Sequence, residues 1–399
     1  MSDARGFNTL AIHAGQEPDP LTGAVIPPIY QTSTFVQDGI NVLRGGHEYS
    51  RGSNPTRDGF QTQLAALEGG HAGFAFASGL AGEDALLRAV LEPGDHIVLG
   101  GDGYGGTNRL VNQLLGRWGV SNTAVDITDP AAVRAAVRPG ATRVLWLETP
   151  SNPLLGIADI AAWAQIAREA DALLVVDNTF ASPYLQRPLA LGADVVVHST
   201  TKYIGGHSDV LGGAVIVSDR EFRGQSLAAA VGFQQFAGGA VAGPQDSYLA
   251  ARGLKTLGLR MERHSSNAQE IAEWAREQDG VAQVLYPGLP EHSGHELAKR
   301  QMSGFGGIVS LRFGDEASAR TFAESTRLFA LSVSLGGVES LACYCSEMTH
   351  ASVRDTELAV PTDLVRLSVG VEDVADLKED IAQALAAVRA ARGVVPAAV

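Results

Sequence analysis

One lysine stands directly after an apolar, strand-like run and three hydroxyl side chains. The run ADVVVH is followed by STTK, so that Lys202 closes a Ser-Thr-Thr sequence. The chain has only four lysines, and a lysine seldom lies deep in a sheet protein unless it is paired or used in chemistry. A lysine desolvated among hydroxyls has a lowered pKa and can form an imine with an aldehyde. Lys202 is therefore our first candidate for a catalytic residue.

Other strand-like runs end in residues that suit an anion or a ring nitrogen. Ser78–Leu80 follow AGFAFA and begin a helical pattern, where free backbone N–H groups can bind a phosphate, although helix capping by the serine is the commoner use. Asp177 follows LLVV, and Glu148 and Asn152 lie in LETPSNP. Acids at strand ends most often form caps or turns, but a buried carboxylate is also the group that keeps a pyridine nitrogen protonated.

A glycine-rich segment, GGDGYGGTNR, permits two interpretations. Gly101, Gly103 and Gly106 fit the dinucleotide-binding spacing, and Asp126 follows at a suitable distance, which supports an NAD hypothesis. Against it, the segment follows the second strand rather than the first and lacks small residues for close helix packing. The alternative is a loop that presents Tyr104, whose ring can stack on a flat cofactor.

These candidates follow consecutive strands of one pattern. Short continuous apolar runs alternate with helical stretches, which predicts an α/β fold with a mainly parallel sheet covered by helices on both faces. Ligands of such sheets gather outside the carboxyl ends of the strands. A phosphate cradle, a stacking ring, a pyridinium partner and an amine at these ends are the parts that hold pyridoxal 5'-phosphate (PLP).

The composition and the pattern of apolar residues along the chain predict three regions. Residues 1–55 are rich in Gly, Pro, Thr and Ser and predict an extended arm, an unusual use of so many residues unless the arm clasps something. Residues 56–253 carry the alternating strands and helices of a large domain. Residues 254–399 combine longer helices with scattered strands and predict a smaller α+β domain, closed by a helix with Leu377 and Ile381 on one face.

Composition argues against several classes of partner. The net charge of −14 disfavours nucleic acid and anionic membranes, which need a basic face. The first residues lack the apolar core of a secretory signal, and no uncharged apolar run reaches the roughly 18 residues of a spanning helix. Cys343 and Cys345 are too close in sequence to bridge readily, and no further ligand pair completes a zinc site. We expect a cytoplasmic enzyme with reduced thiols, no metal and a small-molecule substrate.

The motifs, in their order along the chain, resemble those of the Cys/Met-metabolism family of PLP-dependent enzymes. The resemblance runs from YSRGSNPTR to LVRLSVGVED. This family includes cystathionine γ-lyase, cystathionine γ-synthase, methionine γ-lyase and O-acetylhomoserine sulfhydrylase. It implies the type I PLP-dependent transferase fold and a homotetramer, a dimer of dimers with each active site shared between two chains.

The resemblance also implies residue roles. Lys202 forms the Schiff base with the cofactor and moves protons between substrate carbons, while Tyr104 stacks on the ring and acts as acid or base. Asp177 is the pyridinium partner. The remaining cofactor contacts are Ser78, Gly79, Leu80, Ser199 and Thr201 at the phosphate, Asn152 at the phenolic oxygen, and Tyr49 and Arg51 at a neighbouring subunit's phosphate. Arg366 binds the substrate α-carboxylate, with Ser334 nearby.

The residues that select the substrate give conflicting indications. Arg109 and Glu148 match the cystathionine enzymes, and Gly106 stands where methionine γ-lyases usually have a cysteine. Val333, however, replaces the acid with which cystathionine enzymes meet a second amino group, unless it serves only for packing. We expect a γ-lyase acting on cystathionine and also on methionine or homocysteine. The alternatives are a γ-replacing enzyme (cystathionine γ-synthase or O-acylhomoserine sulfhydrylase), a non-catalytic homologue, and the disfavoured NAD-dependent oxidoreductase.

Overall fold

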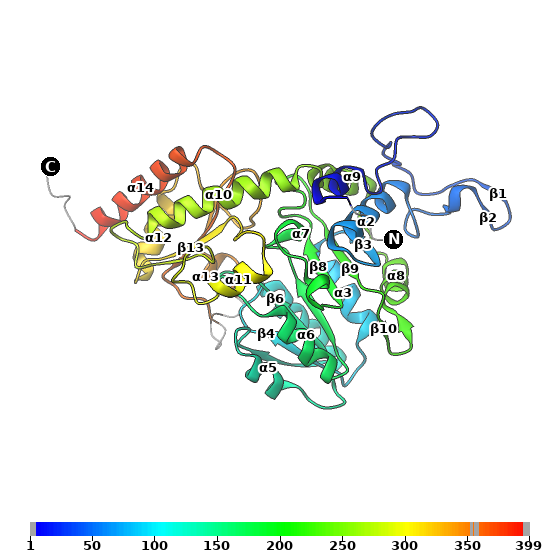
Figure 1. Ribbon diagram of the computed structural model, residues 1–399, viewed down its shortest axis with the longest axis horizontal. Coiled ribbons are helices and arrows are strands. Elements are labelled where there is room, and N and C mark those ends of the chain that lie inside the picture. The colour runs from blue at the N-terminus through cyan, green and yellow to red at the C-terminus, as the bar shows by residue number, and fades with distance from the viewer. Residues whose placement is uncertain (1–4, 352–353, 355–358, 394–399) are drawn as a thin grey trace.

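The computed structural model describes residues 5–351, 354 and 359–393. Two β-sheets lie side by side along the long axis, the larger one built from the N-terminal half and the smaller from the C-terminal part (Figure 1). The prediction of a mainly parallel sheet covered by helices is confirmed. The predicted boundary between residues 253 and 254 stays a prediction.

The larger sheet has seven strands in the order β3-β9-β8-β7-β6-β4-β5. Strands β4 to β8 run parallel to one another, and β9 is antiparallel to both of its neighbours. The bounds are β3 Ala72–Phe76, β4 His96–Gly100, β5 Ser121–Val125, β6 Thr142–Glu148, β7 Leu173–Asp177, β8 Val195–Ser199 and β9 Gly213–Val217. Strand β5 was not predicted, because it is a polar edge strand with partly exposed residues.

Both faces of this sheet are buried, which explains the continuous apolar runs. Along β7, Leu173 and Val175 face the core under α3 (Gly79–Val90) and α8 (Leu227–Gly238), whereas Leu174 and Val176 face the core under α6 (Ile160–Glu169). A strand covered on both sides has no polar face, so it shows no alternation. The carboxyl ends of β6, β7 and β8 therefore meet at one edge, where Glu148, Asp177 and Ser199 lie.

The smaller sheet has five strands in the order β12-β13-β16-β15-β14, antiparallel except for β14 with β15. The strands are β12 Gln283–Leu285, β13 Ile308–Arg312, β14 Ala330–Leu331, β15 Leu341–Cys343 and β16 Leu364–Ser368. Helices α12 (Glu316–Ser325) and α14 (Val374–Ala391) pack together, and Leu377 and Ile381 are buried as predicted. The long α10 (Leu257–Ala275) contacts elements of both parts of the molecule (Figure 1).

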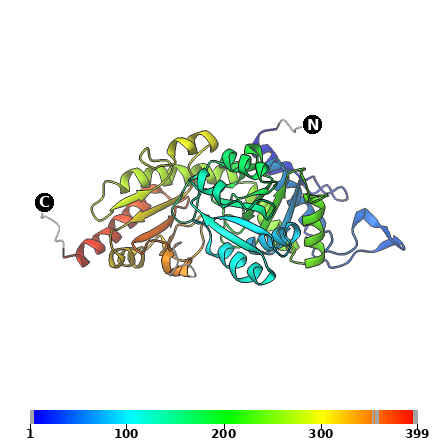
Figure 2. The same ribbon diagram turned by 90° about the horizontal axis from the view of Figure 1, so that it is seen from below.

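The N-terminal region is not extended throughout. Residues Phe7–His13 form α1, which packs on α2 (Pro55–Glu68) and α10. After it the chain leaves the body, and the hairpin of β1 (Gln37–Gly39) and β2 (Val42–Leu43) stands apart from it in both views (Figures 1 and 2). Ile40 at the tip of this hairpin is 94% exposed.

Shorter elements complete the fold. They are α4 Gly105–Arg109, α5 Pro130–Ala136, α7 Ser182–Leu185, α9 Pro244–Leu254, α11 His295–Gln301, α13 Cys345–Met348, β10 Glu221–Phe222 and β11 Gln225–Ser226. In the part of the chain that the structure describes, every helix is too short or too polar to cross a lipid bilayer.

Candidate active site

A cavity of about 280 Å³ lies at the carboxyl ends of β6, β7 and β8. Most of the predicted site residues line it. They are Ser78, Gly79, Leu80, Tyr104, Glu148, Asn152, Asp177, Ser199, Thr201, Lys202, Val333, Ser334 and Arg366. The last three come from the C-terminal part of the chain, so the cavity is closed by both sheets.

A larger cavity of about 980 Å³ lies behind the loop that carries Tyr104. Its lining includes Asp102, Asp126 and Arg312, but neither Lys202 nor the three hydroxyl residues that precede it, Ser199–Thr201. The smaller cavity is therefore the candidate active site, although it offers less space.

Lys202 is held with its amine in this smaller cavity. Its Nζ donates a hydrogen bond to Ser334 Oγ at 2.6 Å. Burial, together with the nearby positive charge of Arg366, lowers the pKa of Lys202 to about 8. Since each pKa unit is a factor of ten in the neutral fraction, the amine is a far better nucleophile and base at neutral pH than an exposed lysine.

The two glycines after Lys202 shape the turn that presents it. Gly206 has φ +73°, and any side chain there would overlap the guanidinium of Arg260. That guanidinium donates to the carbonyl of Tyr203 at 2.7 Å, while the N–H of Gly206 donates to the carbonyl of Lys202 at 2.7 Å. The Gly-Gly pair is thus required by close packing around the lysine segment.

The N-terminus of α3 forms an anion cradle. Ser78 caps the helix by accepting a hydrogen bond from Ala81 N at 3.1 Å. A Cβ on Gly79 would lie 3.2 Å from Ser199 Cβ, so this glycine lets the helix start approach the end of β8 closely. Thr201, two residues after Ser199 in the sequence, also lines the cavity. Free helix N–H groups beside hydroxyls are a suitable site for a phosphate.

Asp177, at the end of β7, also lines the cavity. Its Oδ1 accepts a hydrogen bond from Thr179 N at 2.9 Å. Burial raises the pKa of Asp177, while the hydrogen bonds from Thr179 and the nearby His198 ring oppose the rise. Behind it, His198 Nε2 and Glu68 Oε1 form a buried pair at 2.6 Å. A cationic ring nitrogen in the cavity would stabilise the carboxylate of Asp177.

Tyr104 forms one wall of the cavity. Its backbone N–H donates to Glu148 Oε2 at 2.7 Å, so Glu148 positions the tyrosine loop as well as lining the cavity. The ring packs directly over Gly106, where any side chain would overlap it. Burial raises the pKa of the Tyr104 phenol, and the positive charge of Arg109 opposes this.

Arg366 is buried on β16 and has two of its nitrogens engaged. Its Nη1 donates to Asn152 Oδ1 at 2.7 Å, and its Nη2 donates to the carbonyl of Ser334 at 2.8 Å. Arg366 Nε is buried without a hydrogen-bond partner in the described residues. These contacts orient the guanidinium and leave it a cationic group at the cavity wall.

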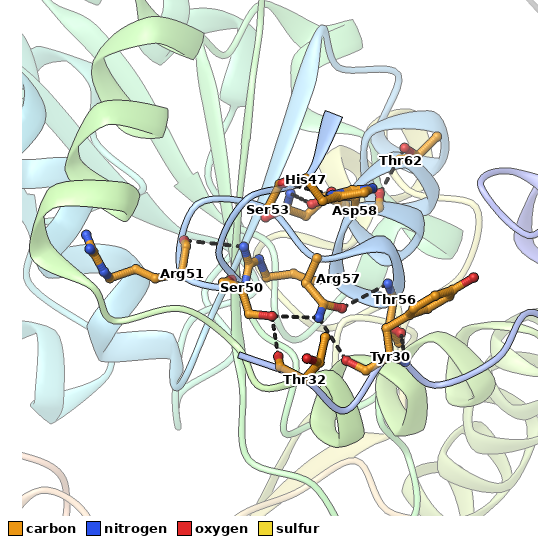
Figure 3. Close-up of polar contacts among 12 residues, drawn as sticks. Tyr30, Thr32, His47, Ser50, Arg51, Ser53, Thr56, Arg57, Asp58 and Thr62 are labelled. Carbon is orange, nitrogen blue, oxygen red and sulfur yellow. Dashed lines mark hydrogen bonds and ion pairs between the residues drawn. The ribbon is translucent and has the colours of Figure 1, made fainter. Parts of the chain in front are cut away.

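Three predicted site residues lie outside this cavity. Arg109 is exposed on α4, and Tyr49 and Arg51 are exposed on the segment before α2. Figure 3 shows the polar contacts that hold that segment around Ser50 and Arg57, where Arg57 donates to the carbonyl of Ser50 at 2.6 Å. Asn54 also donates to the carbonyl of Tyr30, at 2.9 Å. The segment is therefore fixed, but it does not reach the cavity of its own chain.

Arg51 is oriented by a separate element. Its Nη1 donates to the carbonyl of Phe236 on α8 at 2.8 Å, and its guanidinium lies 4.7 Å from the centre of the Phe236 ring. Tyr49 lies beside the same guanidinium. Both residues are thus presented outward as a pair.

The sequence interpretation missed several lining residues, among them Glu83, Thr179 and Thr349. Glu83 is an acid that is only 4% exposed. Burial and the nearby charge of Asp177 raise the pKa of Glu83 to about 8. Helical spacing could have found it, because Glu83 lies one turn after Gly79 and so shares its face of the helix.

The residues present fit PLP. Gly79 lets the N–H groups at the start of α3 lie close to Ser199 at the end of β8, so that both can contact one phosphate. A lysine amine and a buried carboxylate lie in the same cavity. A phosphate cradle, an amine and an acid for a ring nitrogen are the donor set that this cofactor requires.

Comparison with known proteins agrees with this site. A family model described as Cys/Met metabolism PLP-dependent enzyme matches residues 8–386. A cystathionine gamma-synthase of Mycobacterium bovis is 56% identical over 95% of this chain and 97% of its own length. A cystathionine beta-lyase of Lactococcus lactis subsp. cremoris is 50% identical over 95% of this chain and 98% of its own.

Solved structures give the same result. The structure of metB from Corynebacterium glutamicum has a TM-score of 0.94 at 51% identity and covers 97% of this chain and 99% of its own. Cystathionine gamma-lyase from Lactobacillus plantarum, complexed with L-serine, has a TM-score of 0.91 at 43% identity, covering 96% of this chain and 100% of its own. The PLP family replaces the NAD alternative. The chain belongs to the Cys/Met-metabolism family of PLP-dependent enzymes and is an enzyme acting on sulfur amino acids.

Proposed function

We propose that the protein catalyses γ-elimination from cystathionine, and also from methionine or homocysteine, to give 2-oxobutanoate, ammonia and a thiol. The observation that supports this is Val333, an apolar residue at the cavity wall next to Ser334. Without an acid at this position the site binds a second amino group less tightly. Substrates whose sulfur-containing side chain lacks such a group are therefore accepted alongside cystathionine.

PLP, when bound, supplies an electron sink that makes the substrate's Cα and then Cβ protons acidic. The phosphate contacts belong to Ser78–Leu80, Ser199 and Thr201, and the ring nitrogen contact to Asp177. Lys202 would hold the cofactor through its amine, and the same amine would serve as the base when the substrate is in place. Its lowered pKa suits it to take a proton from Cα and return one at Cγ.

Arg366 is the group for the substrate's α-carboxylate. Its guanidinium is already oriented by Asn152 and by the carbonyl of Ser334. A fixed, buried guanidinium binds a carboxylate with charge-assisted hydrogen bonds and fixes the direction in which the rest of the substrate points. Ser334 also contacts Lys202 Nζ, so the carboxylate site and the proton-moving amine are connected through one residue.

Tyr104 is the second acid or base. Its ring forms the cavity wall, and Glu148 fixes its backbone. Burial raises the pKa of the Tyr104 phenol, and Arg109 only partly opposes the rise, so Tyr104 is suited to donate a proton in the cavity.

A second candidate, γ-replacement, is favoured by the relatives. The relative at 56% identity is named a cystathionine gamma-synthase. Such an enzyme would use the same residues up to loss of the γ-substituent and would then add cysteine to the remaining four carbons. Val333 gives it no further support, because the cysteine amino group would lack an acid partner just as the distal amino group of cystathionine does.

A substrate panel distinguishes the two candidates. Purified holoenzyme is incubated with cystathionine, methionine, homocysteine, and O-acyl-homoserine with or without cysteine. Formation of 2-oxobutanoate from the first three supports the elimination. Cystathionine formed from O-acyl-homoserine plus cysteine, with no keto acid from cystathionine, would overturn it in favour of the synthase.

We further propose that the active site is completed by a second copy of the chain, in a dimer that pairs into a tetramer. The exposed pair Tyr49 and Arg51 would then contact the phosphate in the neighbouring cavity. Support comes from the apolar side chains that the N-terminal region exposes, including Leu21 and Ile40. Mixing Lys202→Ala chains with Arg51→Ala chains tests this: mixed dimers have one intact site, so activity should reappear from two inactive proteins.

A further inference from the structure

Glu83 is a buried acid that the proposed mechanism does not use. It lies on α3, one turn after Gly79, and lines the same cavity as Asp177 and Glu148. Its Oε2 is buried without a hydrogen-bond partner in the part of the chain that the structure describes. An unpaired carboxylate in such a place is costly, so the group needs either a proton or a cation.

The cavity offers Glu83 no cation. Of the two basic groups that line it, Lys202 Nζ contacts Ser334, and Arg366 contacts Asn152 and the carbonyl of Ser334. Within the described residues Glu83 takes part in no ion pair. A proton is therefore the remaining way to satisfy the carboxyl group.

Three acids share this small space, and their surroundings differ. Asp177 accepts a hydrogen bond from the Thr179 backbone, and the His198 ring lies near it. Glu148 accepts a hydrogen bond from the Tyr104 backbone. Glu83 has only the Thr107 hydroxyl beside it. When buried carboxyl groups lie close together, the proton goes to the one that is least stabilised as an anion.

We propose that Glu83 is a positioning residue that stays protonated at neutral pH and so leaves the negative charge opposite the cofactor's ring nitrogen on Asp177. This inference rests on the proposed cofactor site, but not on the choice between elimination and replacement. Ionisation of Glu83 at alkaline pH adds a second negative charge near Asp177 and the Tyr104 phenol. The added charge makes the phenol harder to ionise and perturbs the bound cofactor.

The charged and titratable groups that face Glu83 come from each neighbouring element. They are Tyr104 at the start of α4, Glu148 at the end of β6 and Asp177 at the end of β7, with His198 of β8 behind Asp177. Among them the charge of Asp177 opposes ionisation of Glu83, while burial also raises the pKa values of Glu148 and Tyr104. The rise in the pKa of Glu83 to about 8 agrees with this arrangement.

The test is an absorption titration of the holoenzyme, which needs no substrate. Wild type and Glu83→Gln are titrated from about pH 6 to about pH 10 while the visible band of the bound cofactor is recorded. Glutamine copies the shape and the neutral charge of the protonated acid. At pH 7 we expect the two spectra to coincide, with kcat/KM for any accepted substrate within about twofold. At alkaline pH only the wild type should show an additional step, near pH 8.

Two controls complete the experiment. Asp84→Asn removes a neighbouring negative charge from the same helix, but Asp84 pairs with Arg88 at the surface, so its titration should match the wild type. Glu83→Met retains the length without a carboxyl group and should also lack the extra step; it serves if the glutamine variant fails to fold. A changed spectrum in Glu83→Gln at pH 7, or superimposable titrations at every pH, would overturn the proposal.

Discussion

Val333 offers a direct test of how the cavity selects its substrate. The change is Val333→Glu, which places an acid beside Ser334 at the wall of the cavity. Val333 is 49% exposed, so a new carboxylate there is half solvated. Fully desolvated charged contacts contribute roughly 1.5–3 kcal/mol, and exposed ones about 0–1 kcal/mol. A value of about 1–1.5 kcal/mol is therefore appropriate, which corresponds to roughly a 5- to 13-fold change.

The gain should apply only to a substrate with a second amino group. We expect kcat/KM for cystathionine, relative to methionine, to rise about 5- to 13-fold, because only cystathionine carries a distal ammonium for the new acid. The assay is 2-oxobutanoate release from each substrate under identical conditions. Added salt should reduce the gain, since a half-exposed ion pair is screened.

The matched control is Val333→Gln, which has the same length without the charge. If the glutamine variant shifts the ratio as much as the glutamate variant, the effect is one of shape and the electrostatic reasoning fails. An unchanged or reversed ratio in Val333→Glu would show that Val333 does not face the distal end of the substrate.

Three further outcomes are expected. Lys202→Ala should abolish both turnover and the lysine-bound cofactor band; a variant that keeps both would disprove the assignment. Arg366→Lys should raise KM roughly 10- to 100-fold, because one ammonium cannot replace the guanidinium that spans Asn152 and Ser334; an unchanged KM would place the substrate carboxylate elsewhere. Glu83→Gln should stabilise the fold at alkaline pH. The folded pKa of Glu83, about 8, is above its ordinary value of 4.5, so the folded state holds its proton more tightly. Wild-type stability is therefore lost as pH rises between these values. The variant should gain about 5 kcal/mol at most above pH 8 and nothing at pH 4, as measured by thermal unfolding; an equal gain at both pH values would contradict this.

Local pattern was sufficient for much of the fold. The continuous apolar runs AGFAFA, LLVV and ADVVVH correctly predicted β3, β7 and β8, because a strand buried on both faces leaves a signal in its own residues. It failed for β5, whose residues are polar and partly exposed at the sheet edge. It also failed for α1, a short helix that is held by packing on α2 and α10 rather than by its own sequence.

The site shows the same division. Lys202 and Asp177 were predictable because they end strands of a parallel sheet, and such ends converge by topology. Only the tertiary structure decided which groups share a small cavity and which of them are protonated there. It placed Ser334 and Arg366, more than 130 residues away in sequence, against Lys202. It left Tyr49 and Arg51 outside the cavity of their own chain, and it enclosed Glu83 with two other acids. Burial and neighbouring charge set a protonation state. Neither can be read from the sequence, in which Glu83 and the partly buried Asp84 are adjacent acids of one helix with the same local signal.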